Sequence, residues 1–239
     1  MKSFLLFDDY EKMSAAAAEK IVSAIRENPR AVLVLATGHS PLLAYRMAAE
    51  RILREKLDLS GVTFVKLDEW TGLSREDGAT CEVFLKKEFL GPLGVGEENF
   101  LHFDPEAKDP AAECRRVAGA YEALPDPDLV ILGIGRNGHL GLNEPGAALS
   151  LSAHPASLEK TTLGHEMLRH ASGAVSGGMT LGVGELFRGK TLLLLADGEG
   201  KEKGLLYLRN DLLDTACPVS LLKLHPGLEV FVNKKSFGL

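Results

Sequence analysis

Short apolar runs recur along the chain and alternate with longer stretches whose apolar residues have helical spacing. The runs that predict strands are Ala31–Ala36, Val62–Leu67, Asp128–Ile134, Thr191–Ala196 and Leu228–Val232, with a shorter one at Leu101–Phe103. The stretches that predict helices run from Pro41 to about Leu57, over about Thr80–Leu90, roughly Pro110–Ala123 and Glu199–Leu208. Apolar strands separated by helices are typical of a parallel sheet whose two faces are both covered.

The pattern therefore predicts an α/β protein with one Rossmann-like, three-layer domain over residues 1–239, built on a mostly parallel sheet with helices on both faces. No internal repeat, low-complexity tract or linker interrupts it. Ligands of such sheets bind beyond the carboxyl ends of the strands. Three loops are therefore candidates for chemistry: those after Ala36, Leu67 and Ile134.

The first loop reads Thr37-Gly38-His39-Ser40-Pro41. Gly38 allows close backbone approach and Pro41 suits a first helical turn, so the free N–H groups there form a candidate anion site. A phosphate would fit, with the Thr37 and Ser40 hydroxyls as extra donors. The alternative is a capped helix start with no ligand. The loop lacks the ending of a Walker motif.

The second loop begins Asp68-Glu69-Trp70, directly after a buried strand. Successive strand residues point to opposite faces, so the two acids are not expected to act as one carboxylate pair. One would face the cleft while the other anchors the structure. The alternative is a solvated strand end.

The third loop, Gly133 to Gly146, carries Asn137, His139 and Glu144 among many glycines. Its glycine spacing is not a nicotinamide fingerprint, because Pro145 interrupts a following helix and no ribose-binding acid follows at the usual distance. Histidine titrates near neutral pH, so His139 can move a proton if Glu144 or Asn137 orients it. The alternative is a histidine satisfied by loop carbonyls.

Composition removes several function classes. The chain has 27 Lys and Arg against 33 Asp and Glu, a net charge of −6, which argues against nucleic-acid binding. No apolar stretch is long enough to cross a membrane, and the apolar run near the start is too short for a secretory signal. We therefore expect a cytoplasmic soluble protein. The three cysteines lack the spacing of a disulfide framework or zinc site, and we expect no catalytic role for Cys81, Cys114 and Cys217.

The sequence leaves the roles of some residues outside the three loops undecided. Lys201 could reach a phosphate, although a surface lysine is usually only solvated. His165 and His170 have poor spacing for a shared metal, and His225 is as consistent with a structural as with a functional role.

The run GIGRNGHLGLNEPG resembles the signature of the glucosamine-6-phosphate deaminase/isomerase family. The resemblance extends over nearly the whole chain through LATGHSP, VTFVKLDEWTGL, TLLLLADGEGK and VSLLKLHPGLEVFVN. The details KLDEW, ATCE, NGHLGLNEPG and HEML look most like the galactosamine-6-phosphate branch. The related 6-phosphogluconolactonases share the fold, but they typically have DER in place of Asp68-Glu69-Trp70 and a different segment after the GH pair.

The resemblance implies that a 2-amino sugar 6-phosphate opens its ring, that a base moves the C2 proton to C1, and that the imine is hydrolysed to a ketose 6-phosphate and ammonia. Asp68 would be the base, with a raised pKa, and His139 would assist ring opening, oriented by Glu144. The residues that would hold the phosphate are Gly38, His39 and Ser40 with Lys201, and Arg169 from a lid at about 153–178. No metal or organic cofactor is expected.

Two features depart from the family pattern. Asn137 stands where many members carry Asp, so Glu144 would have to compensate. The lid is short and poorly matched. The longer C-terminal portion of the hexameric, allosteric members is also lacking, which predicts a monomer or small homo-oligomer without N-acetyl sugar activation.

Three functions remain at this point. The first is the amino-sugar-6-phosphate deaminase/isomerase, acting on glucosamine or galactosamine 6-phosphate. The second is a sugar-phosphate lactonase or an isomerase of sugars without an amine. The third is a non-enzymatic sugar-phosphate sensor. The lack of a basic DNA-binding region, and the presence of Asp68, His139 and Glu144 together, favour catalysis.

Overall fold

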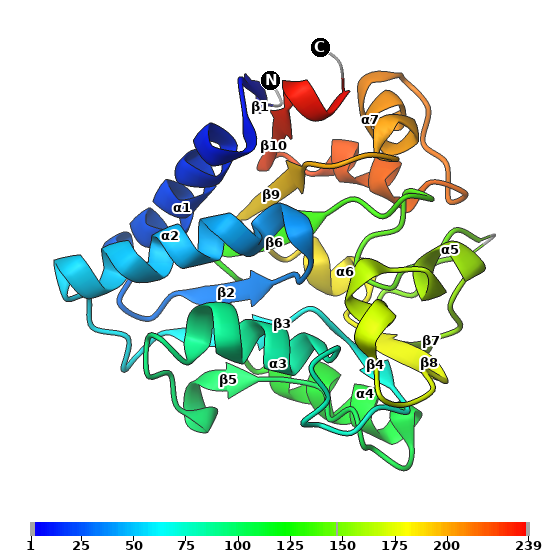
Figure 1. The fold of residues 1–239 in the computed structure, drawn as a ribbon, viewed down its shortest axis with the longest axis horizontal. Helices are drawn as coiled ribbons and strands as arrows, with labels where there is room; N and C mark the ends of the chain where they lie inside the picture. Colours follow the sequence, from blue (N-terminus) through cyan, green and yellow to red (C-terminus); the bar gives the residue numbers. More distant parts are fainter. Residues whose placement is uncertain (1–2, 147, 238–239) are drawn as a thin grey trace.

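Seven parallel strands form the central sheet of the computed structural model, which describes residues 3–146 and 148–237 (Figure 1). The spatial order is β1-β10-β9-β6-β2-β3-β5. The strands are β1 (Ser3–Phe7), β2 (Val32–Leu35), β3 (Thr63–Lys66), β5 (Phe100–Leu101), β6 (Leu129–Gly133), β9 (Thr191–Ala196) and β10 (Leu228–Asn233). Strand order reverses between β2 and β6, so the loops after these two strands flank the crevice where such sheets bind ligands.

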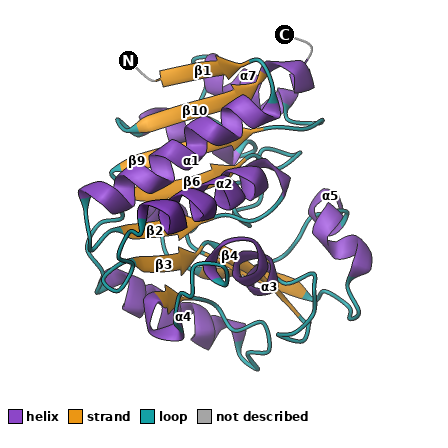
Figure 2. Ribbon diagram, turned by 60° about the vertical axis from the view of Figure 1, so that its left-hand side comes forward, coloured by secondary structure: helices purple, strands orange, loops and turns teal. Residues whose placement is uncertain are grey.

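Helices cover both faces of this sheet (Figure 2). One face carries α1 (Tyr10–Glu27), α2 (His39–Glu55), α3 (Cys81–Leu85) and the π-helix Lys86–Leu90. The other carries α4 (Pro110–Glu122), α6 (Val183–Leu186), α7 (Glu202–Arg209) and the 3₁₀ helix Pro218–Leu224. Short 3₁₀ turns also occur at Glu97–Asn99 and Lys234–Phe237. The three-layer α/β architecture predicted from the sequence is confirmed.

Alternation along the strands explains why both helical layers form. In β2, Leu33 and Leu35 pack against the α1–α2 layer, whereas Val32 and Val34 pack against the α4–α7 layer. Successive strand side chains point to opposite faces, so a wholly apolar strand must be covered on both.

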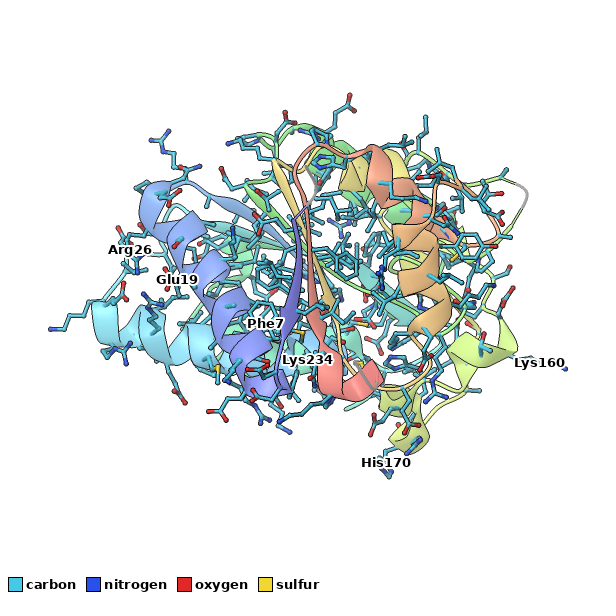
Figure 3. All side chains as sticks on the ribbon, turned by 90° about the horizontal axis from the view of Figure 1, so that it is seen from above. Phe7, Glu19, Arg26, Lys160, His170 and Lys234 are labelled. Atoms are coloured by element: carbon cyan, nitrogen blue, oxygen red, sulfur yellow. The ribbon has the colours of Figure 1, made fainter. Side chains whose placement is uncertain are left out.

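A second, smaller sheet leaves the first immediately after β3. Its order is β4-β8-β7, all antiparallel, with β4 (Asp68–Thr71), β7 (His154–Ala156) and β8 (Gly177–Thr180). Between β7 and β8 the chain forms α5 (Lys160–Leu163) and the 3₁₀ helix Glu166–His170. The segment expected as a lid at about 153–178 is therefore anchored at both ends in this sheet. Figure 3 shows Lys160 and His170 at the edge of the molecule, far from Arg26 on α1.

The structure also differs from the sequence-based expectations. The strand β1 precedes the first helix α1, and neither β1 nor the small sheet was expected. The predicted strand Leu101–Phe103 is Phe100–Leu101. The helix expected from Glu199 begins at Glu202, because Gly198 and Gly200 adopt positive φ angles and keep the preceding residues in a turn.

Candidate active site

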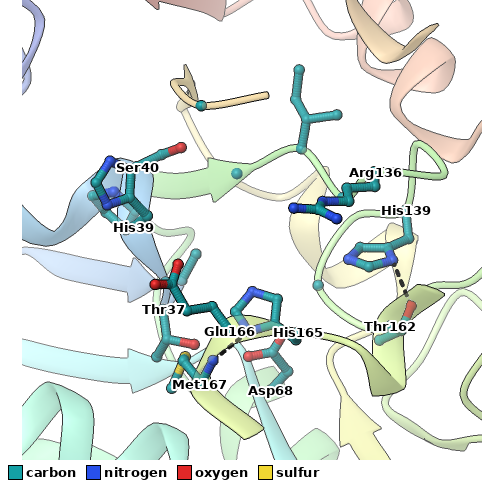
Figure 4. A pocket seen from close by; sticks show the side chains of 18 of the residues that line it. Thr37, His39, Ser40, Asp68, Arg136, His139, Thr162, His165, Glu166 and Met167 are labelled. Carbon is teal, nitrogen blue, oxygen red and sulfur yellow. Dashed lines mark hydrogen bonds between the residues drawn. The ribbon is translucent and has the colours of Figure 1, made fainter. Parts of the chain in front are cut away.

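One pocket opens at the carboxyl ends of β2, β3, β6 and β9, beneath the lid segment (Figure 4). The predicted site residues that line it are Thr37, Gly38, His39, Ser40, Asp68, Asn137, His139, Lys201 and Arg169. Glu144 does not line the pocket but lies behind His139. The three loops selected from the sequence thus meet in one place.

The first loop offers main-chain amides to the pocket. Gly38 precedes α2 with φ at +104°, a conformation that favours glycine, and provides no side-chain cap. No acidic residue lies in the first turn of this helix, so its positive end is not neutralised there. This arrangement suits an anion.

The two hydroxyls of this loop are engaged within the protein. Ser40 Oγ donates to the main-chain oxygen of Asp197 at 3.3 Å and accepts from its N–H at 3.2 Å. Thr37 Oγ1 donates to Cys81 Sγ at 3.3 Å. Packing against β9 and α3 thus supplies both hydroxyls with protein partners, and their role as phosphate donors stays a prediction.

His39 lies at the mouth of the pocket. Its Nε2 is 2.8 Å from Asp197 Oδ2, and its ring stacks on Tyr10 with centroids 4.9 Å apart. More than half of the side chain is exposed. These two neighbours hold the ring at the start of α2.

Asp68 is the buried acid of the second loop. It is 8% exposed, and burial together with the charge of neighbouring Glu69 raises the pKa of Asp68 to about 7, against the opposing effects of Cys81 and Lys66. Cys81 Sγ lies 3.7 Å from Asp68 Oδ1. A carboxyl that titrates near neutral pH can both accept and return a proton.

Glu69 anchors the structure, as the alternation along the strand predicted. Its Oε1 accepts from the N–H groups of Trp70 and Cys81 at 2.8 and 2.9 Å. Its Oε2 accepts from Lys66 Nζ at 2.7 Å and from the Glu82 N–H at 3.0 Å. Glu69 thereby ties β4 to α3 and fixes the strand that carries Asp68.

His139 is oriented by Glu144. The imidazole Nδ1 lies 3.4 Å from Glu144 Oε2. The same nitrogen lies 3.2 Å from Thr162 Oγ1 (Figure 4), so both contacts are made by Nδ1 and not by Nε2. Burial raises the pKa of Glu144, but hydrogen bonds from His139, Thr162 and Asn137 outweigh it and bring the pKa down to about 2. Glu144 is therefore ionised and can stabilise a proton on Nδ1.

Asn137 forms hydrogen bonds with the carboxylate of Glu144 and with the main chain of the loop, and none with the imidazole ring of His139. Its Nδ2 donates to Glu144 Oε2 at 2.7 Å and to Glu159 Oε2 at 3.0 Å, while its Oδ1 accepts from the His139 N–H at 3.1 Å. The carboxylate beside the imidazole is thus Glu144, with Asn137 holding it in place.

Three cationic side chains, Arg136, Lys201 and Arg169, line the same pocket. Lys201 Nζ donates to the main-chain oxygen of Ile134, and burial together with the charge of Arg136 lowers the pKa of Lys201. Arg136 packs against Gly200 and forms no ion pair with the residues that the structure describes. Arg169 also lines the pocket, from the lid. Positive groups gathered in one pocket attract an anion, although the carboxylates of Asp197 and Glu202 act on Lys201 in the opposite sense.

Sequence reasoning missed three residues of this pocket. Arg136 precedes Asn137 in the third loop, and its position in a candidate site was the available signal. His165 was considered only as a metal ligand, but it lines the pocket. Thr162 contacts His139 from the lid, which no local pattern indicates. Within residues 3–146 and 148–237, no group of three or more His, Cys, Asp or Glu side chains could hold a metal ion, and no helix could cross a membrane.

Comparisons with known proteins agree with this architecture. Residues 8–230 match the family described as glucosamine-6-phosphate isomerases/6-phosphogluconolactonase. The chain is 39% identical to the putative deaminase AgaI of Escherichia coli K12, over 95% of this chain and 90% of that protein. It is 33% identical to a glucosamine-6-phosphate deaminase of Thermoanaerobacter pseudethanolicus, over 97% and 92%.

Solved structures extend the likeness to the whole fold. A monomeric glucosamine-6-phosphate deaminase, described as a missing link of the NagB superfamily, superposes with a TM-score of 0.92 at 31% identity over 100% of both chains. A 6-phosphogluconolactonase of Trypanosoma brucei has a TM-score of 0.78 at 19% identity, over 100% of this chain and 98% of that one, and shows the shared fold alone. The chain belongs to the glucosamine-6-phosphate isomerase/6-phosphogluconolactonase family.

Proposed function

We propose that the protein is an amino-sugar-6-phosphate deaminase/isomerase that converts glucosamine or galactosamine 6-phosphate to the ketose 6-phosphate and ammonia. The observation that carries the proposal is one pocket lined by Asp68, by His139 with Glu144 behind it, and by the cations Arg136, Lys201 and Arg169. The names of the relatives at 33% and 39% identity support the same reaction.

The phosphate would bind at the start of α2. The main-chain amides beside Gly38 and the ammonium of Lys201 would neutralise the dianion, with His39 and Ser40 shaping the loop and Arg169 approaching from the lid. Arg136 adds a further positive charge next to Lys201. This placement directs the reactive end of the sugar toward Asp68 and His139.

Proton transfer would involve His139 and Asp68. His139, with Nδ1 toward Glu144, offers Nε2 to the ring oxygen and C1 oxygen and assists ring opening. Asp68 as a carboxylate takes the C2 proton, and the electron pair moves toward C1 and its carbonyl oxygen. The C1 oxygen takes a proton from His139 Nε2 and becomes a hydroxyl. The nitrogen lone pair then forms the C2=N bond while the Asp68 carboxyl returns the proton to C1, and the proton released from nitrogen restores His139. Water then adds to the C2 imine, and ammonia leaves.

No organic cofactor is required for these steps. The carbonyl of the opened sugar accepts the electron pair from C2, and the amine provides the leaving group. The protein's part is to position the groups and transfer protons, and each such group contributes roughly 10²–10⁴ in rate.

The proposal is tested by measuring ammonia release from glucosamine 6-phosphate and galactosamine 6-phosphate with a coupled assay. We expect ammonia and a ketose 6-phosphate in equal amounts from at least one of them. A ketose formed from an amine-free sugar phosphate, with no ammonia from either amino sugar, would favour a simple isomerase. Binding without any turnover would favour a sensor.

A further inference from the structure

Cys81 is buried directly behind the proposed base, and none of the steps above uses it. The side chain is 2% exposed, does not line the pocket and belongs to the first residue of α3. Its Sγ lies 3.7 Å from Asp68 Oδ1 and 3.3 Å from Thr37 Oγ1. The thiol therefore stands between the loop after β2 and the carboxyl that would take the C2 proton.

The direction of these two contacts follows from the proton that each group holds. Thr37 Oγ1 donates its proton to the sulfur. Burial, followed by the charges of Glu69 and Asp68, raises the pKa of the Cys81 thiol, so the sulfur keeps its own proton at neutral pH. A thiol has one proton to donate, and the acceptor at hydrogen-bond distance is Asp68 Oδ1. The S–H bond accordingly points at the carboxyl.

This hydrogen bond opposes the factors that keep Asp68 protonated. Burial and the charge of Glu69 raise the pKa of Asp68 to about 7, whereas the hydrogen bond from Cys81 and, less strongly, the charge of Lys66 act in the other direction. A hydrogen bond to the ionised form of a carboxyl favours that form. Lys66 Nζ itself lies 2.7 Å from Glu69 Oε2, so the direct contact with Asp68 is made by the thiol.

The other groups around Asp68 do not supply a donor to it. Tyr45 on α2 is near enough for the charge of Asp68 to raise the pKa of its hydroxyl, but that hydroxyl donates to a main-chain oxygen just after β2 at 2.7 Å. Gly141 packs against Oδ2, where a Cβ would lie 3.3 Å away, and His139 and His165 line the same pocket. In the part of the chain that the structure describes, no second side chain donates a hydrogen bond to this carboxyl.

We propose that Cys81 is a positioning residue, which orients the Asp68 carboxyl and favours its ionised form through the S–H···Oδ1 hydrogen bond, while Thr37 fixes the direction of the thiol proton. The inference rests on the proposed function, because the carboxylate is the form of Asp68 that takes the C2 proton. The sulfur touches no reacting atom and acts through Asp68 alone.

Two substitutions of nearly equal volume separate the donor from the packing. Cys81→Ala removes the thiol and its proton, whereas Cys81→Ser keeps a hydroxyl that can donate toward the carboxyl. Cys114→Ala is the matched control, because Cys114 is also a buried cysteine but lies on α4, on the other face of the sheet. If Cys81→Ala does not fold, Cys81→Val takes its place, since valine fills the space and offers no donor.

The first measurement is the pH dependence of kcat/KM, whose acidic limb reports the ionisation of the base in the free enzyme. We expect Cys81→Ala to raise the midpoint of this limb by roughly 0.3–1 pH unit, because the carboxylate loses a hydrogen bond. Below the midpoint this shift lowers kcat/KM about two- to tenfold, and well above it the loss should disappear. Cys81→Ser should shift the midpoint less, and Cys114→Ala should not shift it.

The second measurement follows the Asp68 carboxyl carbon by NMR, with the resonance assigned through Asp68→Asn. This titration does not need turnover, and we expect its midpoint to rise in Cys81→Ala as the kinetic midpoint does. The same order of variants should hold, with Cys81→Ser between Cys81→Ala and the unaltered protein.

An equal loss of rate at every pH in Cys81→Ala, a midpoint that is unchanged or lowered, or equal shifts in the alanine and serine variants would show a packing role alone and overturn the inference. The two proposals fail in different ways. If the unaltered protein releases no ammonia from either sugar, the proposed function is wrong, and the NMR midpoint still tests the contact. If it releases ammonia and neither midpoint rises, only the role of Cys81 is wrong.

Discussion

Asp68 combines burial with a function that requires charge. The carboxyl is 8% exposed and lies beside Glu69, and both factors disfavour its ionised form. A base of this kind is stronger than an ordinary aspartate but is ionised only as the pH rises through about 7. The buried position of Asp68 therefore supports proton transfer and, once the carboxyl is ionised, lowers the free energy of unfolding.

Replacing Asp68 with Asn is expected to lower the rate of ammonia release by a factor of at least roughly 10²–10⁴, because an amide cannot take the C2 proton. Affinity for a non-isomerisable sugar-alcohol 6-phosphate should change little, since the phosphate contacts lie at α2 and Lys201. Turnover assays and calorimetric binding would measure the two effects. If binding is lost together with turnover, Asp68 has a different role.

The same variant is expected to be more stable than the unaltered protein at pH 8. The folded-state pKa of about 7 lies above the usual value of 3.8, so between these pH values the folded protein holds a proton that the unfolded chain releases. Stability conferred by Asp68 is thus lost as the pH rises through this window. The Asn variant avoids a cost of up to about 4 kcal/mol. Urea unfolding should show the difference at pH 8 and its decline toward pH 4.

Part of this residue-scale detail follows from the sequence. The alternation of strand side chains separates Asp68 from Glu69, because it is a local property of any strand. The engagement of Thr37 with Cys81 and of Ser40 with Asp197 depends on how α3 and β9 pack, so no local pattern could predict it.

At the scale of elements, the loop after β6 positions His139 through close backbone packing. A Cβ atom at Gly135 would lie 2.2 Å from Nε2 and 2.3 Å from Cδ2 of His139, closer than any side chain permits. The loop needs glycine there so that the imidazole can lie against the main chain.

Gly135→Ala is therefore expected to displace the imidazole and lower kcat about a hundredfold, within the range for a general acid–base group. Gly119→Ala is the control, because a Cβ there meets nothing within 4 Å and the residue lies inside α4. The control should keep full activity and gain up to about 1 kcal/mol of stability from helix propensity. A folded Gly135→Ala protein with unchanged kcat would contradict the role given to this packing.

The interior strands of the central sheet could be predicted because buried parallel strands are apolar throughout, whereas the edge strand β1 was missed. The small sheet could not be predicted, since β7 reads HPA and β8 reads GGMT, and neither has a strand pattern of its own. The pairing of β8 with β4 and of β7 with β8 comes from tertiary structure. For the same reason Thr162 and His165, which the lid brings to the pocket, were not expected there.

For the molecule as a whole, every group that the proposed reaction uses lies in or directly behind one pocket of this chain. The site is therefore expected to work without residues from a second copy, and we predict a monomer or small homo-oligomer with a hyperbolic dependence of rate on substrate. Light scattering and initial-rate kinetics measure these properties. A hexamer, or a sigmoidal curve altered by an N-acetyl sugar phosphate, would contradict the prediction.

The small sheet joins the base and the lid in one structural unit. Asp68 on β4 pairs with Thr180 on β8, and Thr180 also pairs with His154 on β7, so one end of the lid pairs directly with the strand that carries the base and the other end is joined to it through β8. Residues between β7 and β8 can be exchanged in the course of evolution while these ends stay paired. Substrate preference can then diverge between descendants of one ancestral enzyme, as long as Glu159 and Thr162, which contact Asn137 and His139, are kept.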